Sequence, residues 1–256
     1  MMHRESCECS TEGLEIDRVP QTMSVLEKAQ WEEYYPLNAI DNRNAGAPVE
    51  FEIKGHGEDF LDLAQTYVYI KLKITQTNGT DLANDTQTTP VNNFLHSMFN
   101  EIDLSLNGKI ISPSTNTYPY RAYLETLLSY RPDTLKKSIK ASNLWVKDEG
   151  GKMDTGNPHQ DDKTDAAYNA SLRARHSLIK ESKEVELFDR LHLDMFQQKN
   201  YLVNGVDVRL RFNRASTPYC LFGTADGKNQ DFQHDVICTQ SASDARYHQS
   251  SQRIIE

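Results

Sequence analysis

Long apolar runs are missing from this sequence. No stretch of about 18 apolar residues occurs, so we expect no transmembrane helix. The N-terminal segment MMHRESCECS carries charges without a following apolar core, which argues against a secretory signal peptide. Three glycosylation sequons, at Asn78, Asn84 and Asn169, matter only in a secreted protein, and we interpret them as chance. The sequence therefore predicts an intracellular protein that is not secreted.

Cysteine and clustered basic charge are also scarce. The net charge is −9, and the only basic segments are the short LKKSIK and SLRARHSLIK. Because neutralising phosphates takes clustered lysine and arginine, we expect no direct nucleic-acid binding. A zinc knuckle needs two cysteine pairs, and only one close pair is present. The four cysteines are too few and too unevenly spaced for a disulfide framework: Cys7, Cys9, Cys220 and Cys238.

The common active-site motifs are missing as well, since neither GxSxG, GxGxxG nor GxxxxGK[ST] occurs. His96 and His192 lie in the apolar segments FLHSMF and LHLDMF, where we expect structural, hydrogen-bonded histidines. We predict no enzyme, no metal and no cofactor. The remaining polar groups lie in segments typical of solvated turns and loops, namely His56, Glu58 and Asp59 in GHGEDF and His159, Asp161, Asp162 and Asp165 in PHQDDKTD.

What the sequence has in abundance is strict alternation of apolar and polar residues. It runs through VEFEIK (49–54), TYVYIKLKIT (66–75), FNEIDLSL (99–106) and VDVRLRF (206–212). Successive side chains leave opposite faces of a strand, so this pattern indicates half-buried strands. Many such strands with polar outer faces favour an antiparallel sandwich or barrel. Further strands are predicted at 143–146, 184–188, 191–196 and 219–222.

Two Asn-Gly pairs predict hairpin turns. Asn107-Gly108 follows one alternating segment, and Asn204-Gly205 precedes another. Asparagine and glycine tolerate the positive φ angles that a two-residue hairpin turn needs.

One amphipathic helix interrupts the strands. Pro119 suits its first turn, and Pro132 prevents it from continuing beyond Arg131. A lone helix of about a dozen residues is unstable in water, so we predict that its apolar stripe packs on the sheet. A second short helix is expected at 172–182. The stripe follows a 3.6-residue period and consists of Tyr120, Tyr123, Leu124, Leu127 and Leu128.

Three segments carry a family resemblance. They are GEDFLDLAQTYVYIKLKIT (57–75), VNNFLHSMFNEIDLSLNGKIISPSTNTYPYRAYLETLLSY (91–130) and LFDRLHLDMFQQKNYLVNGVDVRLRFNRA (187–215). The series resembles the major capsid proteins of polinton (Maverick) elements and adintoviruses. The middle segment is also similar to capsid proteins of virophages and large DNA viruses, in which a strand, a tight turn, a strand and a helix follow one another.

The resemblance implies the N-terminal half of a double jelly-roll protein. In that family two eight-stranded barrels stand side by side in one chain, and three chains form a capsomer. We therefore expect an all-β, antiparallel, eight-stranded jelly roll with one or two short helices. Its partners would be copies of itself and other capsid proteins, and its location the virion, assembled in the host cytoplasm or nucleus.

The resemblance also suggests how the chain is divided. We expect an N-terminal arm over 1–45, the first barrel over 46–223 with polar loops at 77–90 and 147–171, and a divergent tail over 224–256. The tail lacks the alternating strand that the resemblance implies there, and we interpret the chain as a truncated, spliced or decayed copy, as in an endogenous viral element. Within the arm we predict subunit contacts at Trp31, Tyr34 and Tyr35, because aromatic residues dominate interface energetics; packing on the chain's own barrel is the equal alternative.

Two other function classes remain open. A carbohydrate-binding or ligand-binding jelly roll would behave as a monomer, with Tyr67 and Tyr69 on a concave sheet face. A cupin-like metalloenzyme would need histidines converging inside the barrel, and the eight histidines of this sequence include no HxH pair.

Overall fold

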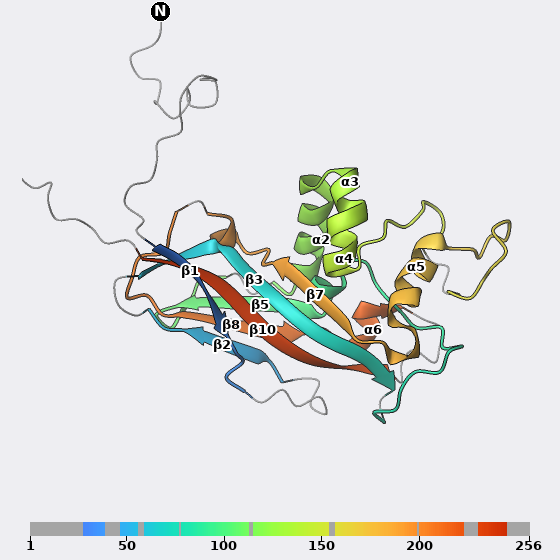
Figure 1. The fold of residues 1–256 in the computed structure, drawn as a ribbon, viewed down its shortest axis with the longest axis horizontal. Helices are drawn as coiled ribbons and strands as arrows, with labels where there is room; N and C mark the ends of the chain where they lie inside the picture. Colours follow the sequence, from blue (N-terminus) through green and yellow to red (C-terminus); the bar gives the residue numbers. More distant parts are fainter. Residues whose placement is uncertain are drawn as a thin grey trace, which may run out of the picture.

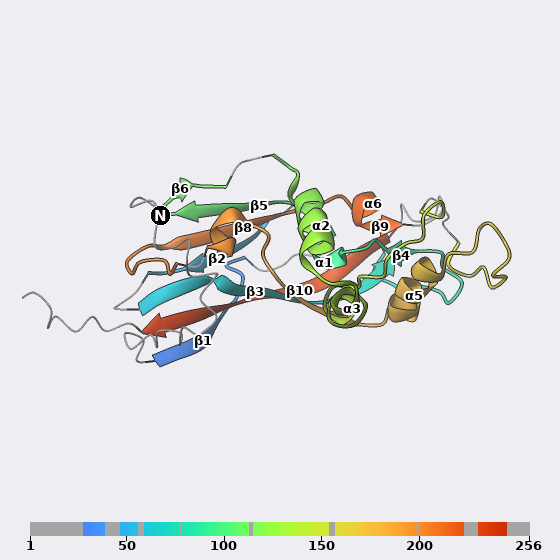
Figure 2. The same cartoon turned by 90° about the horizontal axis from the view of Figure 1, so that it is seen from above.

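The computed structural model contains two four-stranded antiparallel sheets and a small two-stranded sheet, with the α-helices toward one end (Figures 1 and 2). It describes residues 28–38, 47–55, 59–76, 78–112, 115–153, 157–198, 200–222 and 230–244. The strands are β1 (Lys28–Tyr34), β2 (Val49–Ile53), β3 (Asp59–Gln76), β4 (Thr89–Pro90), β5 (Phe99–Leu106), β6 (Lys109–Ile110), β7 (Val185–Arg190), β8 (Val208–Arg214), β9 (Leu221–Phe222) and β10 (Gln230–Asp244).

Consecutive strands tend to fall in different sheets. The first sheet has the order β1-β10-β3-β7, the second β2-β8-β5-β6, and β4 pairs with β9 in a small third sheet. This two-sheet arrangement of antiparallel strands is typical of jelly rolls and confirms a mostly β fold. Within the described part of the chain the ladders do not close into a barrel, however, because β1 and β7 remain edges of the first sheet and β2 and β6 edges of the second. The predicted closed eight-stranded barrel is therefore not confirmed.

The hydrophobic core lies between the two sheets. In β2 and β8 the burial alternates residue by residue, as the sequence pattern predicted. The ring of Phe212 lies 5.5 Å from that of Phe51 and 5.1 Å from that of Phe99, both edge-on. From the first sheet the core receives Val68, Ile70, Leu72 and Ile74 of β3 and Leu187 of β7, all of them buried.

The α-helices lie toward one end of the sheets, the end that carries β4 and β9 (Figure 2). Among the described residues, none of the helices combines the length and the apolar character needed to cross a membrane. The helices are α1 (Phe94–Ser97), α2 (Tyr118–Ser129), α3 (Pro132–Thr134), the π-helix η2 (Leu135–Ile139), α4 (Lys140–Asn143), α5 (Ala170–Ile179), the 3-10 turns η3 (Lys180–Ser182) and η4 (Asp194–Gln197), and α6 (Thr217–Cys220).

Several predicted elements have a different structure. Residues 143–146 are not a strand: α4 ends at Asn143, and Leu144 follows with a left-handed φ of 52°. Residues 191–196 run irregularly into η4. Of the predicted strand 219–222 only its last two residues pair, in β9. These apolar runs are too short for periodicity to separate strands from buried loops and helical turns. The helix predicted at 172–182 is confirmed as α5, with its N-cap at Asn169.

The two Asn-Gly pairs have different roles. Asn107 (φ 48°) and Gly108 (φ 77°) form the predicted two-residue hairpin between β5 and β6. Asn204-Gly205 forms a turn, but the hairpin prediction is wrong there. The turn leads into β8, which pairs with β2 and β5 and not with the strand before it. Gly205 (φ 73°) instead brings the chain against Gly55, whose backbone lies directly beside Val206.

Two strands of the first sheet lie outside the predicted barrel. β1 falls within the segment assigned to the arm, and β10 within the segment assigned to the tail. β10 lies between β1 and β3 and pairs with both, from Gln230↔Gln76 to Asp244↔Asp59 on the β3 side. This strand was not predicted from the sequence, and the first sheet extends beyond the predicted barrel. The division into arm, barrel and tail otherwise stays a prediction.

Candidate functional site

The apolar stripe of α2 faces away from the sheets, which corrects the sequence prediction. The residues that α2 buries include Tyr118, Ala122 and Thr126, spaced at four-residue intervals. The small side chains of Ala122 and Thr126 let the helix approach β5 and α1 closely, so the larger residues are left outside. Periodicity indicated an amphipathic helix but did not show which face is buried. The exposed residues, called here the α2 apolar face, are Tyr120, Tyr123, Leu124, Leu127 and Leu128.

The α2 apolar face is partly supported by neighbouring rings. Tyr123 lies 4.9 Å from the buried Trp145, and Tyr120 lies 5.9 Å from Tyr219, between ring centroids. Leu128, by contrast, is 81% exposed. A hollow of about 370 Å³ borders the face and is lined by Val91, Asn92, Ser97, Pro119, Tyr120, Tyr123, Asp148 and Tyr219. In Figure 1, α2 and α3 project away from the sheets.

A second outward surface is a row of aromatic side chains across the first sheet. Tyr67 of β3 stacks on Phe188 of β7 with ring centroids 4.7 Å apart and an interplanar angle of 7°. Trp31 of β1 lies 5.7 Å from Tyr67 on its other side. The Arg190 guanidinium lies 5.1 Å from the Tyr67 ring centroid and donates hydrogen bonds to its hydroxyl. Trp31 and Phe188 are 58% and 44% exposed, so the row offers apolar area to a partner.

The residues predicted to contact another subunit differ in their exposure, so subunit contact and packing on the chain's own sheets apply to different residues. Trp31 and Tyr35 are exposed. Tyr34 packs against the core, and its hydroxyl donates to Glu32 at 2.6 Å. A subunit-contact role therefore remains a prediction for Trp31 and Tyr35, whereas packing on the chain's own sheets accounts for Tyr34.

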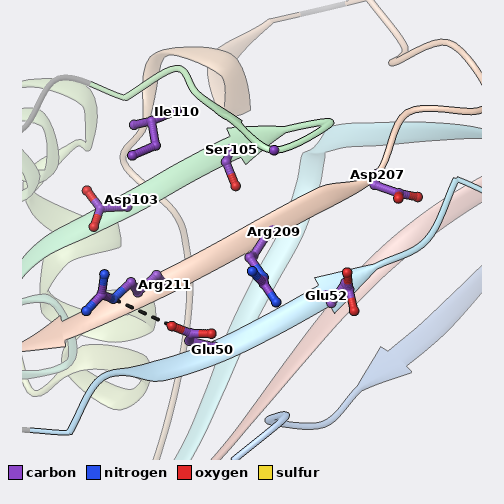
Figure 3. Close-up of a pocket in the computed structure, with 9 residues that line it drawn as sticks. Glu50, Glu52, Asp103, Ser105, Ile110, Asp207, Arg209 and Arg211 are labelled. Atoms are coloured by element: carbon purple, nitrogen blue, oxygen red, sulfur yellow. Dashed lines mark ion pairs between the residues drawn. The ribbon is translucent and has the colours of Figure 1, made fainter.

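A charged hollow of about 310 Å³ lies on the outer face of the second sheet (Figure 3). The strand register sets Glu50 opposite Arg211 and Glu52 opposite Arg209, and Arg211 also lies opposite Asp103. Cross-strand pairs of opposite charge of this kind stabilise sheets. The hollow is thus explained by strand pairing, and we assign no ligand to it. It is lined by Glu50, Glu52, Asp103, Ser105, Gly108, Ile110, Asp207, Arg209 and Arg211.

The other polar segments named from the sequence show loop chemistry. Asp162 accepts hydrogen bonds from the backbone and hydroxyl of Thr164, and Asp165 accepts from Ala167 N–H. The exposed His159 ring contacts the Thr86 carbonyl oxygen. The Cys220 thiol is buried and lies 3.8 Å from the Ser216 carbonyl oxygen. Cys7, Cys9, His56 and Glu58 lie outside the described residues, as do the side chains of Asp59 and Cys238.

One group of ionisable side chains is brought together in the interior. His96 of α1, Asp189 of β7 and His192 just after β7 each have one possible ligand atom, and these three atoms lie within 4.8 Å of one another. His96 Nε2 lies 3.4 Å from Asp189 Oδ2, and the two imidazole centroids are 4.6 Å apart. We call these three residues the His–Asp cluster. The sequence analysis assigned both histidines structural roles separately and did not bring them together.

Burial and neighbouring charges set the protonation of the His–Asp cluster. Burial raises the pKa of Asp189, but the hydrogen bond and charge of His96 outweigh this effect, so the net pKa is lowered. Burial and the charge of His96 lower the pKa of His192 to about 4, although the hydrogen bond that His192 donates to the Glu125 carboxylate raises it. At neutral pH the cluster therefore presents a carboxylate and a neutral imidazole.

Comparisons with known proteins bear on the fold. No family model matches the chain. The uncharacterized protein F54H12.2 of Caenorhabditis elegans is 26% identical over 140 residues, which is 52% of this chain and 33% of that protein. A chain in the structure of the Sputnik virophage aligns with 97% of this chain and 53% of its own length, at a TM-score of 0.55 and 10% identity. The chain shares its fold with this Sputnik chain.

Other solved structures align less closely. The mavirus major capsid protein gives a TM-score of 0.44 and 13% identity over 93% of this chain and 50% of its own length. VP54 of PBCV-1 gives a TM-score of 0.46 and 12% identity over 84% of this chain and 42% of its own length. The chain thus spans about half the length of the solved structures it resembles, and a third of the curated relative.

Proposed function

We propose that this chain is a capsid-like structural protein that works by self-assembly and not by catalysis. The carrying observation is the shared fold with a chain of the Sputnik virophage over 97% of the present sequence. The resemblance of three sequence segments to polinton and adintovirus capsid proteins supports the same role and the finer assignment to that group. On this proposal the chain is located in a virion, and its partners are further capsid subunits.

The α2 apolar face is the contact surface that this function would use. Five apolar side chains on one projecting helix form a larger exposed patch than scattered surface leucines do. Fully burying a leucine side chain contributes about 1.5–3 kcal/mol. A neighbouring copy of the chain, as in a trimeric capsomer, would bury this face, and the exposed Trp31 would supply a second anchor.

Light scattering across a concentration series tests the proposal. We expect trimers or larger assemblies of the wild-type chain. The double variant Leu124→Ser/Leu128→Ser should associate at least about 100-fold more weakly, because two buried leucines contribute about 3 kcal/mol or more. Leu178→Ser removes an exposed leucine of α5 and serves as the matched control.

Three outcomes would count against this function. The wild-type chain could remain monomeric at every concentration, or the Leu178→Ser control could weaken association as much as the double variant does. A monomer that binds glycans on an array would instead favour the carbohydrate-binding class.

A further inference from the structure

The His–Asp cluster has the composition of a transition-metal site. Two imidazoles and one carboxylate are a donor set used by zinc and by non-haem iron. The three residues come from different parts of the fold: α1, the end of β7 and the segment that follows it. His96 is fully buried and Asp189 is 7% exposed, so their polar atoms meet away from bulk water.

The spacing of the ligand atoms suits tetrahedral coordination. With metal–ligand bonds of about 2.0–2.1 Å, neighbouring ligand atoms on a tetrahedral zinc ion are about 3.3–3.4 Å apart. His96 Nε2 and Asp189 Oδ2 are already 3.4 Å apart. His192 lies in the irregular segment between β7 and η4, and its ligand atom lies within 4.8 Å of those of His96 and Asp189.

A second shell of hydrogen bonds surrounds each of the three residues. Glu125 Oε2 lies 2.7 Å from His192 Nδ1, which fixes the proton there and leaves Nε2 as the nitrogen available to a metal. His96 Nδ1 lies 2.9 Å from the Tyr118 hydroxyl, which can accept its proton when Nε2 coordinates. Asn143 Nδ2 donates to Asp189 Oδ2 at 3.1 Å.

Glu125 is itself held in place. Arg121 donates to its Oε1 at 2.7 Å, and Gln197 donates to its Oε2 at 2.7 Å. Outer-shell carboxylates that orient a histidine in this way are a regular feature of metal sites.

We propose that His96, Asp189 and His192 bind a first-row divalent metal ion, zinc in the first instance, with Glu125 as the positioning residue for His192. The ion would join α1 to the segment after β7 and, through Tyr118 and Glu125, to α2. Three protein ligands leave a fourth position to a water molecule.

Metal analysis of the full chain tests this site. We expect stoichiometric zinc, iron or another first-row metal by plasma mass spectrometry after purification without chelator. After removal of the metal, titration with Co²⁺ should give the visible absorption of a tetrahedral nitrogen–oxygen site. Zn²⁺ should displace the Co²⁺ and raise the thermal midpoint.

Variants assign the ligands. His192→Ala and Asp189→Asn should abolish the cobalt spectrum, and Glu125→Gln should weaken metal affinity about 10–100-fold. His159→Ala removes an exposed histidine elsewhere and should change nothing. Glu125 is part-buried, so its variant keeps the test valid if the ligand variants fail to fold. Equal metal binding by wild type, His192→Ala and Glu125→Gln would overturn the proposal, as would wild-type protein that binds no metal.

Discussion

Asn143 is the residue whose loss should most clearly reveal how the helical end is held to the sheets. Its side chain is fully buried at the end of α4. Oδ1 accepts the backbone N–H of Leu95 at 2.9 Å, while Nδ2 donates to Asp189 Oδ2 at 3.1 Å and to Asn93 Oδ1. One amide thus joins α1, α4 and β7.

The loss of stability expected for Asn143→Ala follows from the two groups that lose their partner, the Leu95 N–H and the Asp189 carboxylate. A buried backbone donor without a partner costs about 1–3 kcal/mol, and a hydrogen bond to a charged group contributes about 1.5–3 kcal/mol. We therefore expect the free energy of unfolding to fall by about 3–5 kcal/mol. Asn143→Asp should be worse still, since it sets a second carboxylate against Asp189 and removes the donor.

Urea denaturation followed by circular dichroism measures these free energies. Asn78→Ala is the matched control, because Asn78 is exposed and hydrogen-bonds only within its own turn, to Thr80. We expect the control to lie within about 0.5 kcal/mol of wild type. If Asn143→Ala were equally mild, or milder than the control, the argument that this amide joins the three elements would be refuted.

Two further predictions concern packing and pH. Gly55→Ala should destabilise the fold by about 1–3 kcal/mol, because a Cβ there would lie 2.4 Å from Val206 N, whereas Gly150→Ala, with open space around it, should be nearly neutral in the same denaturation assay. Burial lowers the pKa of His176, whose Nδ1 contacts the Thr88 carbonyl oxygen, so the unfolded chain takes up this proton first as the pH falls below about 6.5. Wild type should therefore lose stability between pH 7.5 and 5, and His176→Asn, which keeps a donor for Thr88, should lose less; an equal loss would contradict the assignment.

The strands that the sequence predicted correctly are those whose burial alternates with every residue. In β2, β3 and β8 one side faces the core and the other faces solvent, so side-chain chemistry reports the geometry directly. β10 was missed because its sequence, QDFQHDVICTQSASD, has few large apolar residues. β10 pairs through its backbone with β1 on one side and β3 on the other. Backbone pairing of this kind leaves no pattern in the side-chain sequence.

The candidate site was less accessible to sequence reasoning. The α2 stripe had the right period, but burial of Ala122 and Thr126 reversed the expected face. His96 and Asp189 meet only because α1 packs near β7, far along the chain. The prediction of a strand at 191–196 was also misleading for His192. Residues 191–193 are irregular, and the His192 ring lies close to His96 and Asp189.

The position of β10 has a consequence for how the protein is made. Residues 77–229 separate β3 from β10. During synthesis on the ribosome, β3 therefore cannot pair with β10 until residues 230–244 have been made. Until then β3 carries an unpaired edge, and such edges attract other chains during slow, non-local folding. Nascent chains on neighbouring ribosomes of one messenger RNA would be able to pair β3 of one chain with β10 of another. We therefore expect the expression rate and the supply of chaperones to govern the yield of correctly folded protein.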